Sequence, residues 1–348
     1  MSERSERVVE FTAGDGLKCN VINVRGAREP SKGPVLLVHG AGVRANIFRA
    51  PSERNLVDLL VDEGWDVWLE NWRASIDIPH NHWTLDQAAV YDHPHAVQTV
   101  CSQTGAAELK AVIHCQGSTS FMMSALAGLV PQVKTILSNA VSLHPIVPRL
   151  ASLKLRSMIP ATARVLGYLD PQWGRVGAPW IVPKLVDAWI KLDHHECDNG
   201  VCKWSSYTYG TGKPTLWSHE NLNEQTHEWL KGEFAAVPLT FFSQIVRCVR
   251  AGHLLSVEHH AELPTDFTAQ SPATEARVVF LAGARNRCFT VESQRASHAW
   301  YAAHAPDRTA LHVFEGYGHL DVFMGQYAAR DVFPTILAEL EDDVGVSL

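Results

Sequence analysis

A cysteine stands at the junction between a predicted strand and a predicted helix. Residues 109–114 are apolar and rich in β-branched side chains, as in a buried strand, and the small and apolar residues of 117–130 predict a helix. Cys115 occupies the turn between them, the place where a strand-to-helix turn holds a nucleophile over a helix N-terminus. The free N–H groups and the positive dipole end there stabilise a thiolate and the oxyanion that it generates. The sequence therefore predicts that Cys115 is reactive.

The residues around Cys115 depart in one place from the usual pattern of a glycine two positions before and after the nucleophile. Gly117 fills the second glycine position, but Ile113 occupies the first, where a strained turn crowds its neighbours. A buried structural cysteine is the alternative interpretation, because free cysteines are among the most buried residues.

Composition and charge exclude several classes of protein. A chain of 348 residues is long enough for one large α/β domain with an insertion. The formal net charge of -7 and the scattered lysines and arginines argue against a nucleic-acid partner. The charged N-terminal residues lead into no apolar segment of signal-peptide length, and no later segment is apolar for long enough to span a membrane. We therefore expect a cytoplasmic protein.

The cysteines favour reduced thiols, because the chain has an odd number of them, 7, at scattered positions. Only Cys197 and Cys202 lie close together. With the preceding His194, His195 and Glu196 they are candidate metal ligands, but the Asp-Asn-Gly between the two cysteines favours a turn equally well. The simpler interpretation is a loop cluster, with an adventitious disulfide as a further alternative, so no metal site is predicted.

Strands and helices alternate along both ends of the chain, as in a mostly parallel sheet covered by helices on both faces. The predicted strands are residues 7–13, 19–24, 34–39, 65–69, 109–114, 133–143, 276–283 and 310–315. The predicted helices are residues 51–63, 84–105, 117–130, 291–305 and 321–340. The fold class is therefore α/β, with a core of residues 1–143 and 271–348 and an inserted cap of residues 144–270.

The inserted segment is rich in tryptophan, since it contains six of the 11 tryptophans of the chain: Trp173, Trp180, Trp189, Trp204, Trp217 and Trp229. Each one alone is explained by ordinary packing inside a cap. Together they predict an apolar pocket over Cys115.

A histidine near the C-terminal end stands where a base for the thiol is needed. His319 lies between glycine-flanked residues in the loop after the last predicted strand. The chain has 18 histidines, so a surface or capping role is the alternative. The loop position and the order of nucleophile before histidine favour His319 as the base.

An oxyanion formed during acyl transfer needs hydrogen-bond donors. The turn at residues 39–42 follows a predicted central strand and supplies the N–H of Ala41. The N–H of Gln116, the residue after the nucleophile, completes the predicted pair. A simple strand-ending turn is the alternative for residues 39–42.

The third catalytic residue is predicted to be Asn286, which follows the strand at 276–283, where such sheets normally carry an aspartate. An asparagine orients an imidazole through its side-chain oxygen, and a thiol needs less assistance than a hydroxyl because its pKa is lower. Glu292 and Asp266 remain alternatives. Asp321 lies so near His319 in sequence that a capping role for the last helix is expected instead.

Three stretches together resemble the α/β-hydrolase superfamily: residues 64–75, residues 91–94, and residues 283–289 with 316–319. Within it, the chain resembles the hydrolase-like domain fused to cholesterol-oxidase-type (GMC) flavoproteins and, more distantly, acid lipases of the gastric type. The resemblance to the lipases implies a serine at position 115 and an aspartate near position 286, whereas this chain has Cys115 and Asn286. Cysteine nucleophiles occur in dienelactone hydrolases and polyhydroxyalkanoate synthases of the superfamily, which adds lactone opening and acyl transfer to the implied chemistry.

The leading hypothesis is a cysteine-dependent acyl hydrolase that cleaves a small apolar ester, thioester or lactone through an acyl-Cys115 intermediate. One alternative is an acyltransferase or carbon–carbon bond-forming synthase that uses the same intermediate. Another is a catalytically silent binding protein, which Ile113 and Asn286 favour. No cofactor is predicted, because the chain has no G-x-G-x-x-G fingerprint. The resemblance implies a separate flavin-dependent oxidoreductase of the same pathway as a candidate partner.

Overall fold

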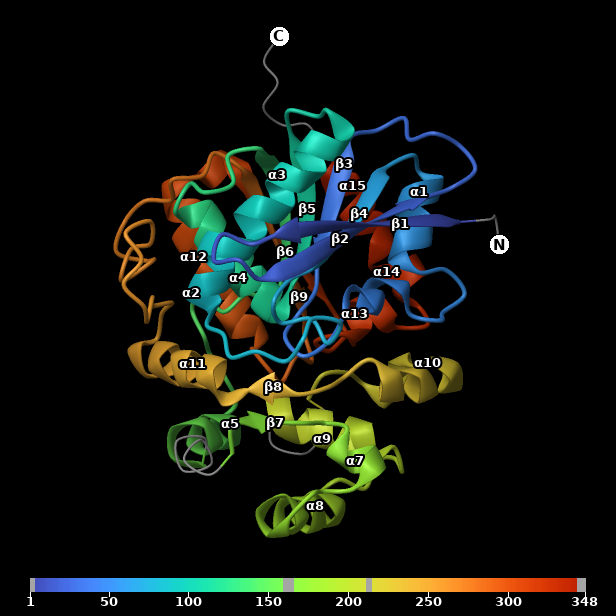
Figure 1. Ribbon diagram of the computed structural model, residues 1–348, viewed down its shortest axis with the longest axis vertical. Coiled ribbons are helices and arrows are strands. Elements are labelled where there is room, and N and C mark those ends of the chain that lie inside the picture. Colours follow the sequence, from blue (N-terminus) through green and yellow to red (C-terminus); the bar gives the residue numbers. More distant parts are fainter. Residues whose placement is uncertain (1–3, 159–165, 211–214, 343–348) are drawn as a thin grey trace.

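A central sheet with a helical layer at one end makes up the computed structural model, which describes residues 4–158, 166–210 and 215–342 (Figure 1). Its strands lie in the order β1-β2-β4-β3-β5-β6-β9-β10. Strand β2 pairs antiparallel with β1 and β4, and all other neighbours in this sheet pair parallel. The mostly parallel sheet expected from the sequence is thus confirmed.

The strands match their predicted positions closely. Their bounds are β1 Ser5–Thr12, β2 Lys18–Arg25, β3 Pro34–Val38, β4 Asp66–Asn71, β5 Leu109–His114, β6 Val133–Asn139, β9 Arg277–Gly283 and β10 Thr309–Phe314. One strand is shorter than predicted, because Ala140 has a φ of 57° and turns the chain out of the sheet after β6. Residues 140–143 were therefore wrongly assigned to that strand.

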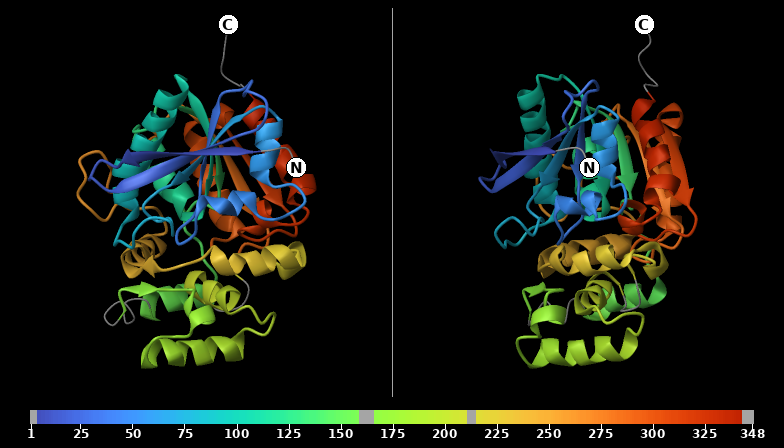
Figure 2. Two further views of the ribbon diagram at one scale, coloured as in Figure 1. Left: turned by 45° about the vertical axis from the view of Figure 1, so that its right-hand side comes forward. Right: turned by 90° about the vertical axis from the view of Figure 1, so that its right-hand side faces the viewer.

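Helices cover both faces of the sheet. Helices α3 (His93–Thr104), α4 (Cys115–Leu126) and α12 (Val291–His304) lie on one face, and α1 (Leu56–Asp62) and α15 (Phe333–Glu341) lie on the other (Figures 1 and 2). The predicted helix at 84–105 exists as α2 (Leu85–Gln87), a π-helical turn (Ala88–Asp92) and α3, and Gly105 ends it in a left-handed conformation. Helix α1 begins later than predicted, because the side chain of Asn55 caps it by accepting a hydrogen bond from the N–H of Asp58.

The last predicted helix, 321–340, is wrong as a single element. The chain forms α13 (Asp321–Met324), α14 (Ala328–Asp331) and α15 instead. Gly325 adopts an extended conformation that ends α13, and Pro334 lies in the first turn of α15, where its missing N–H costs no hydrogen bond.

The helices and short strands described between β6 and β9 form a layer across the carboxyl ends of the parallel strands (Figures 1 and 2). This layer, called the cap below, contains α5 (Arg149–Leu153), α7 (Trp173–Val176), α8 (Ile181–Asp193), α9 (Gly200–Tyr209), α10 (Glu224–Trp229), α11 (Leu239–Ala251) and the short strands β7 (Tyr168–Leu169) and β8 (Val237–Pro238). Helices α10 and α11 lie next to the sheet, and α8 lies farthest from it (Figure 1). The bounds 144–270 for a cap domain stay a proposal.

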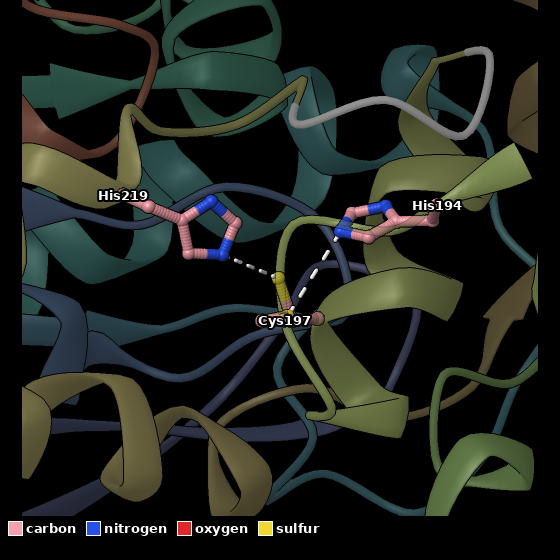
Figure 3. Close-up of side chains that lie close together, drawn as sticks. His194, Cys197 and His219 are labelled. Atoms are coloured by element: carbon pink, nitrogen blue, oxygen red, sulfur yellow. Dashed lines mark hydrogen bonds between the residues drawn. The ribbon is translucent and has the colours of Figure 1, made fainter.

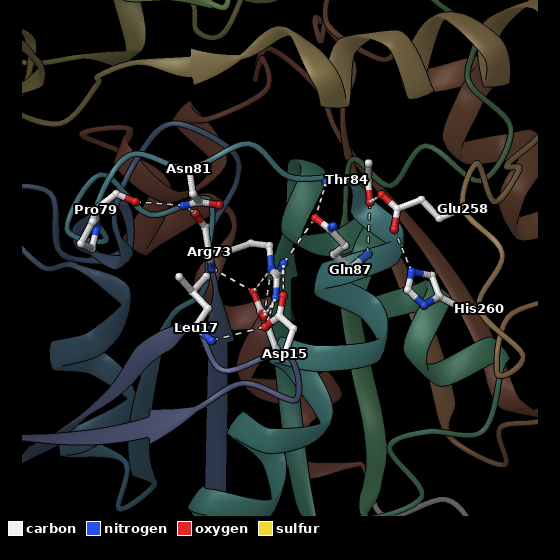
Figure 4. Close-up of polar contacts among 10 residues, drawn as sticks. Asp15, Leu17, Arg73, Pro79, Asn81, Thr84, Gln87, Glu258 and His260 are labelled. Atoms are coloured by element: carbon white, nitrogen blue, oxygen red, sulfur yellow. Dashed lines mark hydrogen bonds and ion pairs between the residues drawn. The ribbon is translucent and has the colours of Figure 1, made fainter.

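A buried ion pair fixes the loop that follows β4. The guanidinium of Arg73 donates to Asp92 at 2.6 to 3.0 Å, and the Arg73 N–H donates to the same carboxylate at 2.9 Å. Both side chains are almost fully buried. Arg73 also reaches Asp15 in the first hairpin and Gln87 in the helix that follows (Figure 4). One cation thus connects three segments of the core.

A second buried network connects this region to the helix that begins at Cys115. His93 bridges Glu70 on β4, at 2.9 Å from Nδ1, and Ser120 on α4, at 2.7 Å from Nε2. The indole of Trp72 donates to the carbonyl of His39 at 2.9 Å. These bonds hold the ends of β3 and β4 against α4.

Among the described residues, no helix is both long and apolar enough to span a membrane.

We expect Asp92→Ala to lower the free energy of unfolding by about 3–5 kcal/mol, because it leaves the buried guanidinium of Arg73 without its main counter-ion. The matched control is Asp62→Ala, which removes the partially exposed half of an ion pair with Arg4 and should cost at most about 1 kcal/mol. Urea unfolding of both variants measures the difference. Equal losses would contradict a dominant role for the buried pair.

Candidate active site

The turn at Cys115 is left-handed, with a φ of 57°. It joins β5 directly to α4, and two glycines make room for it. A Cβ atom on Gly117 would overlap the carbonyl oxygen of His39, and one on Gly40 would lie 2.8 Å from the Cβ of Cys115. Ile113 is fully buried in β5 and does not prevent the turn. The strand–turn–helix geometry predicted for Cys115 is therefore present.

The sulfur of Cys115 lies beside a second cysteine, Cys288, and both side chains are less than 10% exposed. A hydrogen bond from the Cys288 thiol lowers the pKa of Cys115 well below its usual range, against the effect of burial and with further help from His319 and the N–H of Gln116. The same contact raises the pKa of Cys288. The contact thus favours ionisation of Cys115 over ionisation of Cys288.

His319 lies beside Cys115, after the end of β10. A ring nitrogen of His319, a ring nitrogen of His114 and the Cys115 sulfur all lie within 4.8 Å of one another. Nδ1 of His319 is 3.0 Å from the side-chain nitrogen of Asn286. The nitrogen that remains for Cys115 is therefore Nε2. The structure brings the predicted nucleophile, the predicted base and Asn286 together.

Asn286 approaches His319 with its amide nitrogen, so the expectation that its oxygen orients the ring is wrong. The reason is local, because the Asn286 oxygen accepts hydrogen bonds from the N–H groups of Cys288, at 2.9 Å, and Phe289, at 3.3 Å. The NH₂ group is left to face Nδ1 of His319. Since an amide NH₂ only donates, Nδ1 accepts, and the neutral ring carries its proton on Nε2.

The acidic alternatives to Asn286 are engaged elsewhere. Glu292 is exposed at the start of α12, and Asp266 forms an ion pair with His253 of the cap at 3.2 Å. Asp321 is buried and accepts from the N–H of Gly318 at 2.8 Å. It therefore closes the loop around His319 instead of capping α13 with its side chain.

The two predicted oxyanion donors come from the residue after Cys115 and from the loop after β3. Gln116 directs its N–H toward the Cys115 sulfur. Ala41 is buried in the loop after β3, and its carbonyl accepts a hydrogen bond of 2.6 Å from the hydroxyl of Tyr209. Burial raises the pKa of Tyr209 well above its usual value, so the hydroxyl keeps its proton. A cap residue thus fixes the loop that carries the N–H of Ala41, whose role stays a prediction.

Two further buried histidines near the site are neutral. Burial lowers the pKa of His114 well below its usual value, and Nδ1 of His114 bonds Asn139 at 2.8 Å. Burial also lowers the pKa of His39 to about 3. Both shifts favour the uncharged ring.

An apolar cavity of about 30 Å³ opens onto Cys115. It is lined by Cys115, Gln116, Val147, Ala151, Lys154, Leu155, Thr208, Tyr209, Gly210, Phe241, Phe242, Ile245, Cys288 and Phe289. Phenylalanine and aliphatic side chains therefore form the pocket, and the predicted lining by six tryptophans is wrong. Trp204 and Trp217 are buried inside the cap, and Trp189 is 46% exposed.

Three residues of the site were missed by the sequence analysis. Cys288 lies two residues after Asn286, but its contact with Cys115 depends on how β9 and β5 end in space. Tyr209 and Lys154 come from the cap. The ammonium of Lys154 donates to the carbonyls of Tyr207 and Gly210, and burial lowers its pKa to about 7. No local pattern in the sequence indicates these contacts.

No protein-family model matches this chain. Sterol esterase 2 of Saccharomyces cerevisiae is 30% identical over 141 residues, which are 34% of this chain and 26% of that protein. Triacylglycerol lipase 2 of Arabidopsis thaliana is 27% identical over 161 residues, which are 41% of this chain and 38% of that lipase. The chain thus spans well under half the length of either relative.

Solved structures share the fold over nearly the whole chain. An esterase from Exiguobacterium antarcticum has a TM-score of 0.60 at 12% identity, over 97% of this chain and 100% of that one. The chain therefore has the α/β-hydrolase fold. The closer resemblance to flavoprotein-fused domains and gastric-type lipases stays a prediction.

We expect Cys288→Ala to raise the pKa of Cys115, because it removes the hydrogen bond that contributes most to lowering it. The rate of Cys115 alkylation by iodoacetamide should then fall near neutral pH, with its midpoint shifted to higher pH. Peptide mass spectrometry across a pH series measures the rate at Cys115 alone. Cys101→Ala, a half-buried cysteine of α3, is the control that should leave the profile unchanged. An unchanged midpoint in Cys288→Ala would contradict the assigned contact.

Proposed function

We propose that this protein is an acyl hydrolase of the esterase or lipase type in which Cys115 is the nucleophile. The observation that carries the proposal is the Cys115 sulfur in a left-handed turn at a helix N-terminus, with a lowered pKa and an apolar cavity in front of it. The similarity to a sterol esterase and a triacylglycerol lipase supports acyl chemistry on an apolar substrate. The fold of solved esterases is compatible with it.

The proposed acylation step begins from the thiolate. The Cys115 sulfur attacks the carbonyl carbon, a carbon–sulfur bond forms, and the carbonyl electron pair moves onto oxygen. The N–H groups of Gln116 and Ala41 stabilise that oxyanion. The tetrahedral intermediate then collapses and expels the leaving group with its bonding electrons, which leaves an acyl thioester on Cys115. Water later attacks this thioester and releases the carboxylic acid.

The orientation of Asn286 favours substrates whose leaving group departs as an anion. With Nδ1 accepting from Asn286, the neutral ring of His319 has its proton on Nε2, so this nitrogen is able to donate to a thiolate but has no free lone pair for removing a proton. Thioesters and aryl esters need no protonation of the leaving group, whereas alkyl esters do. We therefore infer that thioesters and aryl esters are better acyl donors than alkyl esters.

The same orientation makes hydrolysis of the acyl-enzyme the slow step. A base must take a proton from the attacking water, and His319 becomes that base only when its ring shifts its proton to Nδ1. That shift breaks the hydrogen bond from Asn286, which costs about 1–3 kcal/mol for a buried group.

The cavity itself is small, so only a short acyl group enters without movement of its apolar lining.

The first test is a rapid-mixing experiment with an aryl ester and an acyl thioester of the same short acyl group. We expect about one equivalent of leaving group per chain to appear in a burst, followed by slower turnover. Intact-mass and peptide analysis should place the acyl adduct on Cys115. Cys115→Ala should abolish the burst, and Cys288→Ser should retain the adduct at position 115.

Two outcomes would contradict the proposal. An adduct on Cys288 would show that Cys288, and not Cys115, is the nucleophile. The absence of both adduct and turnover with every donor would favour a binding protein on this fold. Transfer to an added amine or alcohol with no free acid would instead indicate an acyltransferase.

We expect Asn286→Asp to accelerate the slow phase by about tenfold or more, because a carboxylate accepts a hydrogen bond from Nδ1 and frees Nε2 to act as a base. The burst amplitude is the internal control and should stay near one equivalent per chain. The ¹⁵N chemical shifts of His319 should show a proton on Nε2 in the original protein and on Nδ1 in the variant. If the tautomer switches but the rate of the slow phase does not change, proton transfer to His319 does not limit that rate.

A further inference from the structure

Four potential metal ligands converge in the cap, away from Cys115. The ligand atoms of His194, Cys197, Cys202 and His219 all lie within 4.8 Å of one another. His194 and His219 point toward Cys197 from opposite sides (Figure 3). His194 and Cys202 are buried, and the other two side chains are half-buried. The cluster is therefore largely shielded from water.

We propose that these four residues form a structural zinc site of the Cys₂His₂ type. A tetrahedral zinc ion with its usual bond lengths to sulfur and nitrogen separates a sulfur from a nitrogen by about 3.6 Å. The observed separations are 3.4 Å between Cys202 Sγ and His219 Nε2 and 3.9 Å between Cys197 Sγ and His194 Nε2. The side chains thus have nearly the spacing that zinc needs before any movement.

The surroundings of His219 fix the ring in the form that binds a metal. Its Nδ1 lies 3.1 Å from a carboxylate oxygen of Glu196, and Nε2 faces the sulfur atoms. A carboxylate bound to one ring nitrogen holds the proton there and leaves the lone pair on the other, which is the usual arrangement around histidine ligands of zinc. Glu196 is therefore the expected positioning residue of the site.

The chemistry of the donor set favours zinc and a structural role. Two thiolates and two neutral imidazoles balance the charge of Zn²⁺, and binding releases one proton from each cysteine thiol. Four protein ligands fill a tetrahedral site and leave no position for a substrate. Cys197 and Cys202 are both free thiols in this structure, so both are available as ligands.

The turn between the two cysteines builds half of the site. Asn199 caps α9, and its side-chain oxygen accepts from the N–H groups of Val201 and Cys202 at 3.1 and 3.2 Å. These hydrogen bonds of Asn199 set the first turn of α9 so that Cys202 faces Cys197. The turn and the ligand cluster suggested by this sequence segment are therefore compatible interpretations. His219, the ligand farthest along the chain, could not be assigned from sequence spacing.

A metal at this position would tie the cap to the loop around His319. The segment that carries His219 bonds this loop on both sides, since the carbonyl of Leu216 accepts from the N–H of Leu320 at 2.7 Å and Asn221 donates to the carbonyl of Gly316 at 2.9 Å. The other ligands lie at or between the facing ends of α8 and α9. The ion would thus connect the end of α8, the start of α9 with the turn before it, and the segment that carries His219. Without a metal, these three segments meet only through side-chain packing and hydrogen bonds.

The test is the zinc content of the full chain, purified under reducing conditions after growth with added zinc and without a histidine tag. We expect about one zinc ion per chain by inductively coupled plasma mass spectrometry. Cys197→Ser and Cys202→Ser should lower the content at least about tenfold, and Glu196→Gln should weaken retention against a chelator by about tenfold. Cys101→Ser is the matched control, because Cys101 is a half-buried thiol on α3 outside the cluster, and it should keep its zinc.

Cobalt substitution gives a second measurement that does not depend on how the variants fold. Co²⁺ bound by the original chain should show thiolate-to-metal charge-transfer bands and the visible bands of tetrahedral cobalt. A zinc content below about a tenth of an ion per chain, after incubation with excess zinc, would overturn the proposal. So would a disulfide between Cys197 and Cys202 in protein alkylated before unfolding, or an unchanged zinc content in the Cys197→Ser, Cys202→Ser double variant. None of these measurements depends on the proposed hydrolase activity.

Discussion

The left-handed turn at Cys115 is the constraint on which the candidate site depends. A non-glycine residue in that conformation costs about 1–3 kcal/mol and persists only where the surroundings fix it. Gly40 and Gly117 supply the space, since larger residues would collide with the turn or with the strand beside it. The buried bonds of Trp72 and His93 then hold β3, β4 and α4 in the same arrangement. As a result the sulfur, the N–H of the next residue and the loop after β3 meet at one point.

The two departures from a serine–histidine–aspartate site explain each other. An amide at position 286 leaves His319 with an accepting Nδ1 and a protonated Nε2, and this ring does not remove a proton from a hydroxyl group. A serine nucleophile would be strongly impaired by that tautomer. In the proposed mechanism, the thiolate that Cys288, His319 and a helix N-terminus favour needs no proton removed before it attacks. In the proposed mechanism, a cysteine nucleophile at position 115 therefore tolerates an asparagine at position 286.

The sequence predicted those features that depend on neighbouring residues. The strands, the turn at Cys115 and the left-handed end at Gly105 follow from local patterns of apolar residues and glycine. The contact of Cys288 with Cys115, the apolar lining of the cavity and the place of His219 depend on segments that only tertiary packing brings together. The orientation of Asn286 belongs to the same group, because two N–H groups of its own loop decide which end of the amide faces the ring.

The attachment of the cap to the core bears on how the cavity widens for a substrate. On one side, Tyr209 donates to the loop after β3, and the segment that carries His219 bonds the loop around His319. On the other side, α5 contributes Ala151 to the cavity, with Lys154 and Leu155 just after it. Lys154 donates its hydrogen bonds to cap carbonyls and lies over the ring of Tyr207, and the apolar contacts of its neighbours have no preferred direction. A cavity of about 30 Å³ has to widen for most acyl groups, and the hydrogen bonds of Tyr209 and Asn221 hold the loop after β3 and the loop around His319 in place while it does so.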